Sequence, residues 1–254
     1  KKTDYAYTTV LILDEIYLPA VLVLGYSLRK NKCKYNLTCI VQDKPEYKII
    51  NGKKTLFNGV SKEAINEILK IYDIVYGVNL IQIDVKKDNV TKHTDVFKFH
   101  YKNISLYPTK VQALGLIDYK QVIYLDASNV VDKNIDFIFK KYKPYSFPYD
   151  LQAVKTGVGL RAQAFMFKPS LLIYTKAMYL CYNYSRIFKG CSFLRGIDEV
   201  ILFFTIYPRW VIHKKNLWYY IVCHELVVNR KCPIYYYQIS KPFKKYENNV
   251  VAHV

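Results

Sequence analysis

The sequence predicts an α/β fold with a mostly parallel, mixed central sheet flanked by helices. Short apolar runs rich in β-branched residues alternate along the chain with helical patterns, which is typical of a parallel sheet covered by helices. The chain has 254 residues, of which 52% are hydrophobic, enough to bury one large core. We therefore expect a single domain over residues 1–254.

The first predicted unit is a strand, a turn and a helix. An apolar strand is expected over residues 7–13 and a turn over residues 14–17. Pro19 suits an early helical position, because its missing N–H would have no partner there, and the helix should continue through Arg29. A second strand is expected over residues 37–41. This unit is the start of a parallel sheet.

The next predicted elements are a helix, two strands and a loop. Residues 61–72 place apolar side chains on one face after Ser61, a preferred N-cap residue. Strands are expected over residues 74–76 and 80–85. The polar stretch over residues 86–102 is expected to be a long loop, and loops of that length often carry function.

An acidic residue ends the next predicted strand. A helix is expected over residues 107–119, followed by an apolar strand over residues 121–126 that ends in Asp126. In open α/β sheets, ligands bind beyond the carboxyl ends of the strands. A carboxylate there could hold Mg²⁺ or Mn²⁺ beside a diphosphate, or it could simply cap a turn. Asp126 is therefore a candidate site residue.

The chain is strongly basic, with 38 basic and 20 acidic residues and a net charge of +18. This excess indicates an anionic partner, substrate or surface. The lysines are scattered in short groups, with no basic arm and no recognisable nucleic-acid module. The abundance of Lys, Ile, Asn and Tyr is typical of an AT-rich genome, such as that of a protist or a large DNA virus.

The cysteines and the N-terminal region favour a cytoplasmic protein, in the host cytoplasm if the chain is viral. No pair of cysteines has Cys-x-x-Cys spacing, so reduced, partly buried thiols are expected. Acidic residues and Pro19 interrupt the apolar stretch over residues 10–28, which disfavours a membrane span. The first residue is Lys1 and not a methionine, so the sequence leaves open whether a targeting segment precedes it. The six cysteines are Cys33, Cys39, Cys181, Cys191, Cys223 and Cys232.

Several separated segments resemble family 8 glycosyltransferases of the glycogenin type, in the family's order. Residues 108–128 resemble the family's helix, strand and Asp-x-Asp motif, with Asp126-Ala127-Ser128 at the motif. Residues 17–28 resemble the first loop and helix. The other matching segments are residues 134–139, 167–170, 196–202 and 240–243. The resemblance implies a Rossmann-like nucleotide-diphosphosugar transferase domain.

The resemblance also implies a donor site for a UDP-sugar, with UDP-glucose expected. Tyr17 would stack on uracil, while Lys110 and Lys241 would offset the diphosphate charge. Asp198 would lie beside the reacting carbon, as a nucleophile or as a stabiliser of an oxocarbenium-like state, and anomeric configuration would be retained. For each of these four residues, an ordinary structural role is the alternative. The implied donor contacts are Leu11, Leu13, Tyr17, Lys110, Asp126, Ala127, Ser128 and Lys241.

Several positions depart from the family pattern. Ser128 replaces the second carboxylate, and Tyr235 aligns with the metal-binding histidine, so Asp126 is the expected metal ligand that remains. Binding of Mn²⁺ or Mg²⁺ should therefore be weakened. Arg161 and Gln163 stand where the family contacts the donor sugar; an arginine there could replace metal charge or block the sugar. Glu199 replaces the glutamine after the catalytic aspartate. His213 and His253 would serve as ligands only if folding brought them near Asp126.

Three functions are compatible with the sequence. The first is a retaining transferase that moves a sugar from a UDP-sugar to a sugar or protein acceptor, as a homodimer by resemblance. The second is a degenerate relative that binds an anionic polymer or membrane. The third is nucleic-acid binding, which only the charge and the 26 tyrosines favour. Salt dependence would separate the first two.

Overall fold

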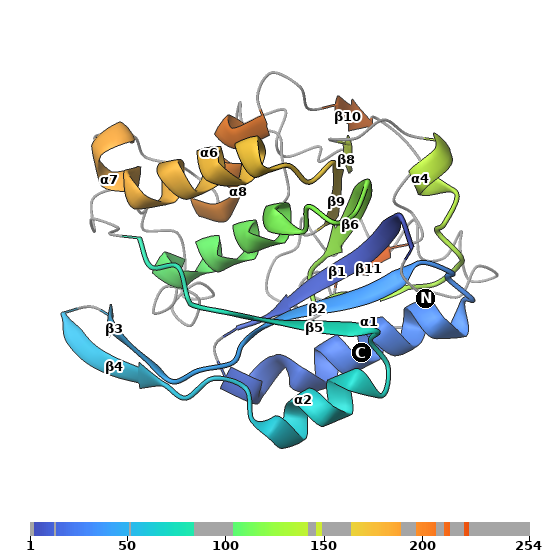
Figure 1. The fold of residues 1–254 in the computed structure, drawn as a ribbon, viewed down its shortest axis with the longest axis horizontal. Coiled ribbons are helices and arrows are strands. Elements are labelled where there is room, and N and C mark those ends of the chain that lie inside the picture. The colour runs from blue at the N-terminus through green and yellow to red at the C-terminus, as the bar shows by residue number, and fades with distance from the viewer. Residues whose placement is uncertain are drawn as a thin grey trace, which may run out of the picture.

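The computed structural model describes residues 3–12, 14–50, 52–83, 104–141, 146–148, 164–188, 197–206, 211–213 and 221–223. Seven described strands form a central sheet in the order β10-β8-β9-β6-β1-β2-β5. Strands β1, β2, β5 and β6 run parallel, and β9 runs antiparallel to β6. Helices cover the sheet (Figure 1), so the predicted fold class is confirmed.

The strands of the sheet agree closely with the predicted apolar runs. Predicted strands at 7–13, 37–41, 74–76 and 121–126 correspond to β1, β2, β5 and β6. The bounds are β1 Tyr5–Leu11, β2 Asn36–Gln42, β5 Ile74–Val78, β6 Gln121–Leu125, β8 Ser146–Pro148, β9 Ala164–Phe167 and β10 Val211–His213. A separate antiparallel pair joins β7 Asn129–Val131 to β11 Ile221–Cys223.

Two apolar cores lie on opposite faces of the sheet, because successive side chains of a strand point to opposite sides. Ala6 and Val10 of β1 belong to the core beneath η4 Ile104–Gly115, α6 Leu171–Tyr182 and α8 Ile197–Ile206. Tyr7 and Leu11 belong to the core beneath α1 Leu18–Lys30 and α2 Lys62–Leu69. Figure 1 shows these two helical layers with the sheet between them.

The helix starts follow the sequence signals. Pro19 occupies the first turn of α1, and the Ser61 hydroxyl accepts a hydrogen bond from Ala64 N at 3.1 Å as the N-cap of α2. Ser170 caps α6 in the same way, accepting from Ile173 N at 3.2 Å. Three of the helices therefore begin at a proline in the first turn or at a serine N-cap, both of which are sequence signals for a helix start.

The region around residues 80–115 differs from its prediction. Residues 80–83 do not form the expected strand, because Ile81 N donates to the Thr109 hydroxyl at 2.9 Å and Ile83 N donates to Ser105 O at 3.0 Å. The helix expected over 107–119 is a 3₁₀ helix, η4, that begins earlier and contains Pro108. The loop expected over 86–102 lies outside the described residues.

A β-hairpin that the sequence analysis missed follows β2. Its strands β3 Glu46–Ile50 and β4 Lys53–Phe57 pair antiparallel, and Figure 1 shows them extending away from the sheet. The Asn51-Gly52 dipeptide is the signal that could have found it, since a two-residue hairpin turn favours this pair. Gly52 has a φ of 76°, which suits glycine. Short elements α4 Ile138–Lys141 and α7 Tyr184–Ile187 complete the described helices.

Gly25→Ala is expected to lower the free energy of unfolding by about 1–3 kcal/mol, because a Cβ at this position would overpack the core. Such a Cβ would lie 2.5 Å from the ring of Tyr72, whose hydroxyl is fixed by a hydrogen bond to Val21 O at 2.7 Å. Urea unfolding measures the change. Gly52→Asn is the control: nothing lies within 4 Å there, and Asn tolerates positive φ. An unchanged midpoint for Gly25→Ala would contradict this packing.

Cys33, Cys39 and Cys181 are free and buried, in agreement with the buried thiols expected from the sequence. Burial raises the pKa of the Cys33 thiol to about 11 and that of Cys181 to about 12, so both are neutral near pH 7. Within the ranges that the structure describes, no helix is both long enough and apolar enough to cross a membrane.

Candidate functional site

The connections between the parallel strands change from one face of the sheet to the other. From β1 the chain runs through α1 to β2 on one face, whereas η4 leads into β6 on the other face. Strands β2 and β6 both pair with β1, one on each side, so the topology switches direction between β1 and β6. Ligands of open α/β sheets bind at the carboxyl ends of the strands at such a point.

Asp126 lies at this switch point, directly after β6. Its carbonyl accepts a hydrogen bond from Asn129 N at 2.9 Å, so residues 126–129 form a tight turn into β7. The side chain of Asp126 keeps 24% of its surface exposed. The sequence prediction that this acid stands at the carboxyl end of a parallel strand is thus confirmed.

Lys110 and Asp198 meet Asp126 from two different helices. The Lys110 Nζ lies 2.6 Å from Asp198 Oδ2 and 3.4 Å from Asp126 Oδ1. Lys110 belongs to η4, which is anchored by the buried hydroxyl of Thr109, and Asp198 belongs to the first turn of α8. We call Lys110, Asp126 and Asp198 the charged trio. Three residues far apart in sequence therefore form one cluster.

The trio is largely shielded from solvent. The side chains of Lys110 and Asp198 are only 13% and 6% exposed. Burial by itself would lower the pKa of Lys110, but the carboxylates of Asp126 and Asp198 outweigh it and raise that pKa well above its usual value. Lys110 is therefore a permanent cation between two acids. With one positive and two negative groups the trio carries a net charge of −1.

Tyr124 is part of the cluster although sequence reasoning passed over it. Its hydroxyl donates to Asp126 Oδ1 at 2.5 Å, and its ring stacks on Phe165 with centroids 5.0 Å apart. Burial, followed by the Asp126 charge, raises the pKa of Tyr124 well above its usual value, so the phenol stays a donor. The period of two in a strand could have found it, since residues 124 and 126 project to the same side.

The loop after β1 brings Tyr17 to the same edge of the sheet. This loop is the 3₁₀ helix η1 Asp14–Tyr17, in which Tyr17 is 37% exposed. Ser61 N donates to Glu15 Oε1 at 2.7 Å, which ties the loop to the start of α2 and lowers the pKa of Glu15. Tyr17 is an exposed aromatic at the carboxyl end of β1 and lies outside both apolar cores.

No model of a known protein family matches the chain. Among curated proteins, it is 30% identical over 144 residues to protein R707 of Acanthamoeba polyphaga mimivirus, which covers 56% of this chain and 42% of that protein. It is 23% identical over 180 residues to Glycogenin-1 of Mus musculus, covering 70% of this chain and 45% of that protein. The glycosyltransferase GlyE of Streptococcus pneumoniae has a similar structure, with a TM-score of 0.51 and 14% identity over 97% of this chain and 51% of GlyE.

The chain is similar in sequence to glycogenins and to a glucuronosyltransferase of Arabidopsis thaliana. The resemblance read from the sequence is confirmed, and the similarity to GlyE confirms the transferase fold. This glycogenin-like chain spans less than half the length of the curated relatives it matches.

The other predicted donor contacts of the glycogenin-like chain fall into two groups. Leu11 is fully buried in the core on the α1 side, so only its backbone could reach a donor, and Ala127 packs against the same core. Ser128 is half-buried beside Asp126. Glu199 follows Asp198 in the first turn of α8. The other residues singled out from the sequence lie outside the described ranges; they are Leu13, Lys241, Arg161, Gln163, Tyr235 and His253. His213 ends β10, which β8 and β9 separate from β6.

The described residues do not fit a divalent metal ion. The Asp126 Oδ1 already accepts hydrogen bonds from Tyr124 and Lys110, and Ala127 and Ser128 supply no second carboxylate. Across the described ranges, no group of three His, Cys, Asp or Glu side chains is placed to hold a metal. Mg²⁺ and Mn²⁺ prefer several hard oxygen ligands.

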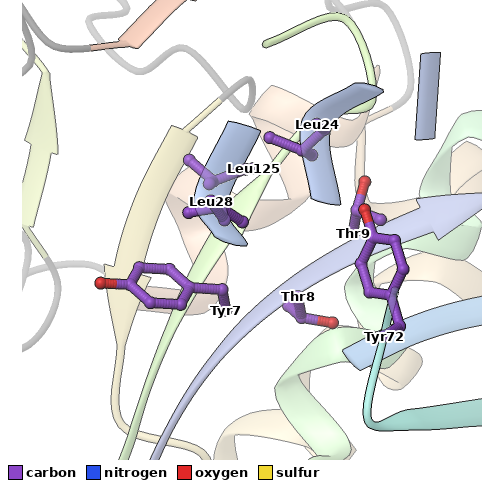
Figure 2. A pocket seen from close by; sticks show the side chains of 7 residues that line it. All are labelled: Tyr7, Thr8, Thr9, Leu24, Leu28, Tyr72 and Leu125. Carbon is purple, nitrogen blue, oxygen red and sulfur yellow. The ribbon is translucent and has the colours of Figure 1, made fainter. Parts of the chain in front are cut away.

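A small interior pocket lies apart from the trio. It is lined by residues of β1, α1 and their neighbours: Tyr7, Thr8, Thr9, Leu24, Leu28, Tyr72 and Leu125 (Figure 2). The hydroxyls of Thr8 and Thr9 have no hydrogen-bond partner among the described residues. None of the charged trio lines this pocket, which sits inside the packing between β1 and α1. It is a feature of the core, separate from the candidate site.

Proposed function

We propose that this chain is a retaining glycosyltransferase that moves a sugar, glucose in the first instance, from a UDP-sugar to a sugar or protein acceptor. The observation that carries the proposal is the charged trio at the topological switch point of a chain similar to glycogenin. We propose further that residues 1–254 act as one domain and pair as a homodimer, as the resemblance implies.

The proposed mechanism gives roles to two members of the trio, Asp198 and Lys110. Asp198 would face the anomeric carbon. It would either bond to that carbon as the bond to UDP breaks, with the acceptor hydroxyl then displacing it, or stabilise the oxocarbenium-like state until the acceptor hydroxyl adds. On both routes the departing diphosphate would take the proton of the acceptor hydroxyl. Lys110 would position Asp198 through the 2.6 Å contact and offset charge on the departing diphosphate. Because the trio carries a net negative charge, the diphosphate needs a further cation, and we assign that role to Lys241.

UDP release from a panel of UDP-sugars tests the proposal directly. The assay would be run with Mn²⁺, with Mg²⁺ and with a chelator, in the presence of common sugar and protein acceptors. Turnover that survives the chelator would support a site in which lysines replace the metal, whereas turnover that needs Mn²⁺ would assign Asp126 as a metal ligand. Absence of UDP release for every donor, with correctly folded protein, would contradict the proposed activity.

Tyr17→Ala is expected to weaken binding of UDP by about 1–3 kcal/mol, because one base-stacking contact would be lost. Calorimetric titration with UDP measures the change. Tyr17→Phe is the matched control, since it keeps the ring and should bind UDP nearly as well as the parent chain. Equal affinity for UDP in the alanine variant would remove Tyr17 from the donor site.

A second candidate function rests on the net charge of +18. In this alternative the chain keeps the fold but binds an anionic polymer or membrane instead of turning over a donor. Binding of a polyanion should fall steeply as salt rises, because counterions are released on binding. Binding of a donor between low and moderate salt should change little. Comparing heparin binding with UDP binding across salt concentrations distinguishes the two functions.

A further inference from the structure

Helix α6 is apolar on both of its sides. Its inner side packs against η4 and α8 through buried residues that include Ile173, Ala177 and Cys181. Its outer side also carries large apolar side chains, with Leu172 74%, Tyr182 72% and Leu171 65% exposed. A surface helix ordinarily places polar residues on the side that faces solvent. The outer side of α6 therefore has the composition of a contact surface.

The outer surface continues beyond the helix and includes cations. Tyr179 is 52% exposed, and its hydroxyl accepts a hydrogen bond from Arg186 Nη2 at 3.0 Å, which holds that guanidinium beside the apolar residues. Lys176 lies on the same side, one turn from Leu172 and Tyr179. We call this set the α6 surface; it comprises Leu171, Leu172, Lys176, Tyr179, Tyr182 and Arg186.

The charge of this region is entirely positive. From residue 167 to residue 196 the sequence contains five lysines and arginines and no aspartate or glutamate. A symmetric contact with a second copy would place this basic segment against itself, which like-charge repulsion disfavours. A polyanion alone would leave the leucines without an apolar partner. A surface that is both apolar and anionic satisfies both kinds of side chain.

We propose that the α6 surface docks on an anionic lipid bilayer, with α6 lying in the plane of the interface. Leu171 and Leu172 would enter the boundary of the acyl chains, as the apolar side of an interfacial helix does. Tyr179 and Tyr182 suit the headgroup level because each has an apolar ring and a polar tip. Lys176 and Arg186 would contact anionic headgroups. Figure 1 shows α6 in the outer helical layer, away from the sheet.

Vesicle co-sedimentation tests this docking. The parent chain is expected to bind vesicles of phosphatidylcholine mixed with phosphatidylserine, to bind phosphatidylcholine alone much more weakly, and to dissociate as salt rises. The variants Leu172→Ser/Tyr182→Ser and Lys176→Gln/Arg186→Gln should each lower binding by about tenfold. Tyr26→Ser/Ile49→Ser is the matched control, because these residues are 62% and 64% exposed on α1 and β3. The control should bind like the parent.

Several results would overturn the proposal. They are equal binding to both kinds of vesicle, no binding to either, or equal losses in the control and in the α6 variants. A self-association that the α6 variants abolish would assign the surface to a second copy, and capture of an acidic protein without vesicle binding would assign it to a protein partner. The proposal does not depend on transferase activity, since UDP release from a soluble assay should be the same in all these variants.

Discussion

Asp198→Asn is expected to lower the rate of sugar transfer by about a thousandfold or more while leaving UDP affinity nearly unchanged. The amide keeps the size of the carboxylate and can still accept a hydrogen bond from Lys110, so the cluster keeps its shape. It lacks the negative charge that the proposed mechanism needs at the anomeric carbon. Single-turnover transfer and UDP titration, measured on the same preparation, separate the two effects.

The control for this variant is Asp4→Asn. Asp4 forms an exposed ion pair with Lys120 at 2.8 Å, so its replacement removes the same charge far from the site. Transfer should be unaffected there. Turnover that persists in Asp198→Asn would remove Asp198 from the chemistry. A parallel loss of UDP affinity would instead indicate that Asp198 shapes the donor site.

Lys110→Met is expected to destabilise the fold by about 3–5 kcal/mol, as well as to abolish transfer. Removing the cation leaves the carboxylates of Asp126 and Asp198 close together and largely buried, and breaking one side of a buried ion pair is costly. Urea unfolding measures the loss. Lys120→Met is the matched control, because its ion pair with Asp4 is exposed and should contribute less than about 1 kcal/mol.

The loss in Lys110→Met should also depend on pH. Without the cation, the two carboxylates repel each other in a largely buried site, and acid relieves that repulsion by neutralising them. The deficit relative to the parent should therefore shrink below about pH 5. In the parent, the raised pKa of Lys110 keeps its contribution constant across neutral pH.

The double variant Lys110→Met/Asp198→Asn completes the comparison. Replacing Asp198 as well removes one of the two carboxylates that repel each other, so the double variant should recover part of the lost stability. Losses that simply add would show that Lys110 and Asp198 do not interact in solution. Such a result would contradict the 2.6 Å contact on which the proposed site rests.

The sequence by itself determined the elements whose signals are local. The apolar runs gave β1, β2, β5 and β6, Ser61 gave the start of α2, and Asp126 was placed at the carboxyl end of its strand. The hydrophobic period, the helix N-cap and the end of a strand each depend on a few neighbouring residues, so they can be predicted without knowing the rest of the fold. The glycogenin resemblance added Lys110 and Asp198 as candidates without bringing them together.

Only the tertiary structure decided which of these residues meet. Lys110 and Asp198 are 88 positions apart, and their 2.6 Å contact depends on how η4 and α8 pack on one face of the sheet. The same packing brought Tyr124 to Asp126 and replaced the expected strand at residues 80–83 with hydrogen bonds to η4. Packing on the opposite face, beneath α1, buried the Leu11 side chain. Contacts between distant segments arise from burial of the whole core, which no local pattern records.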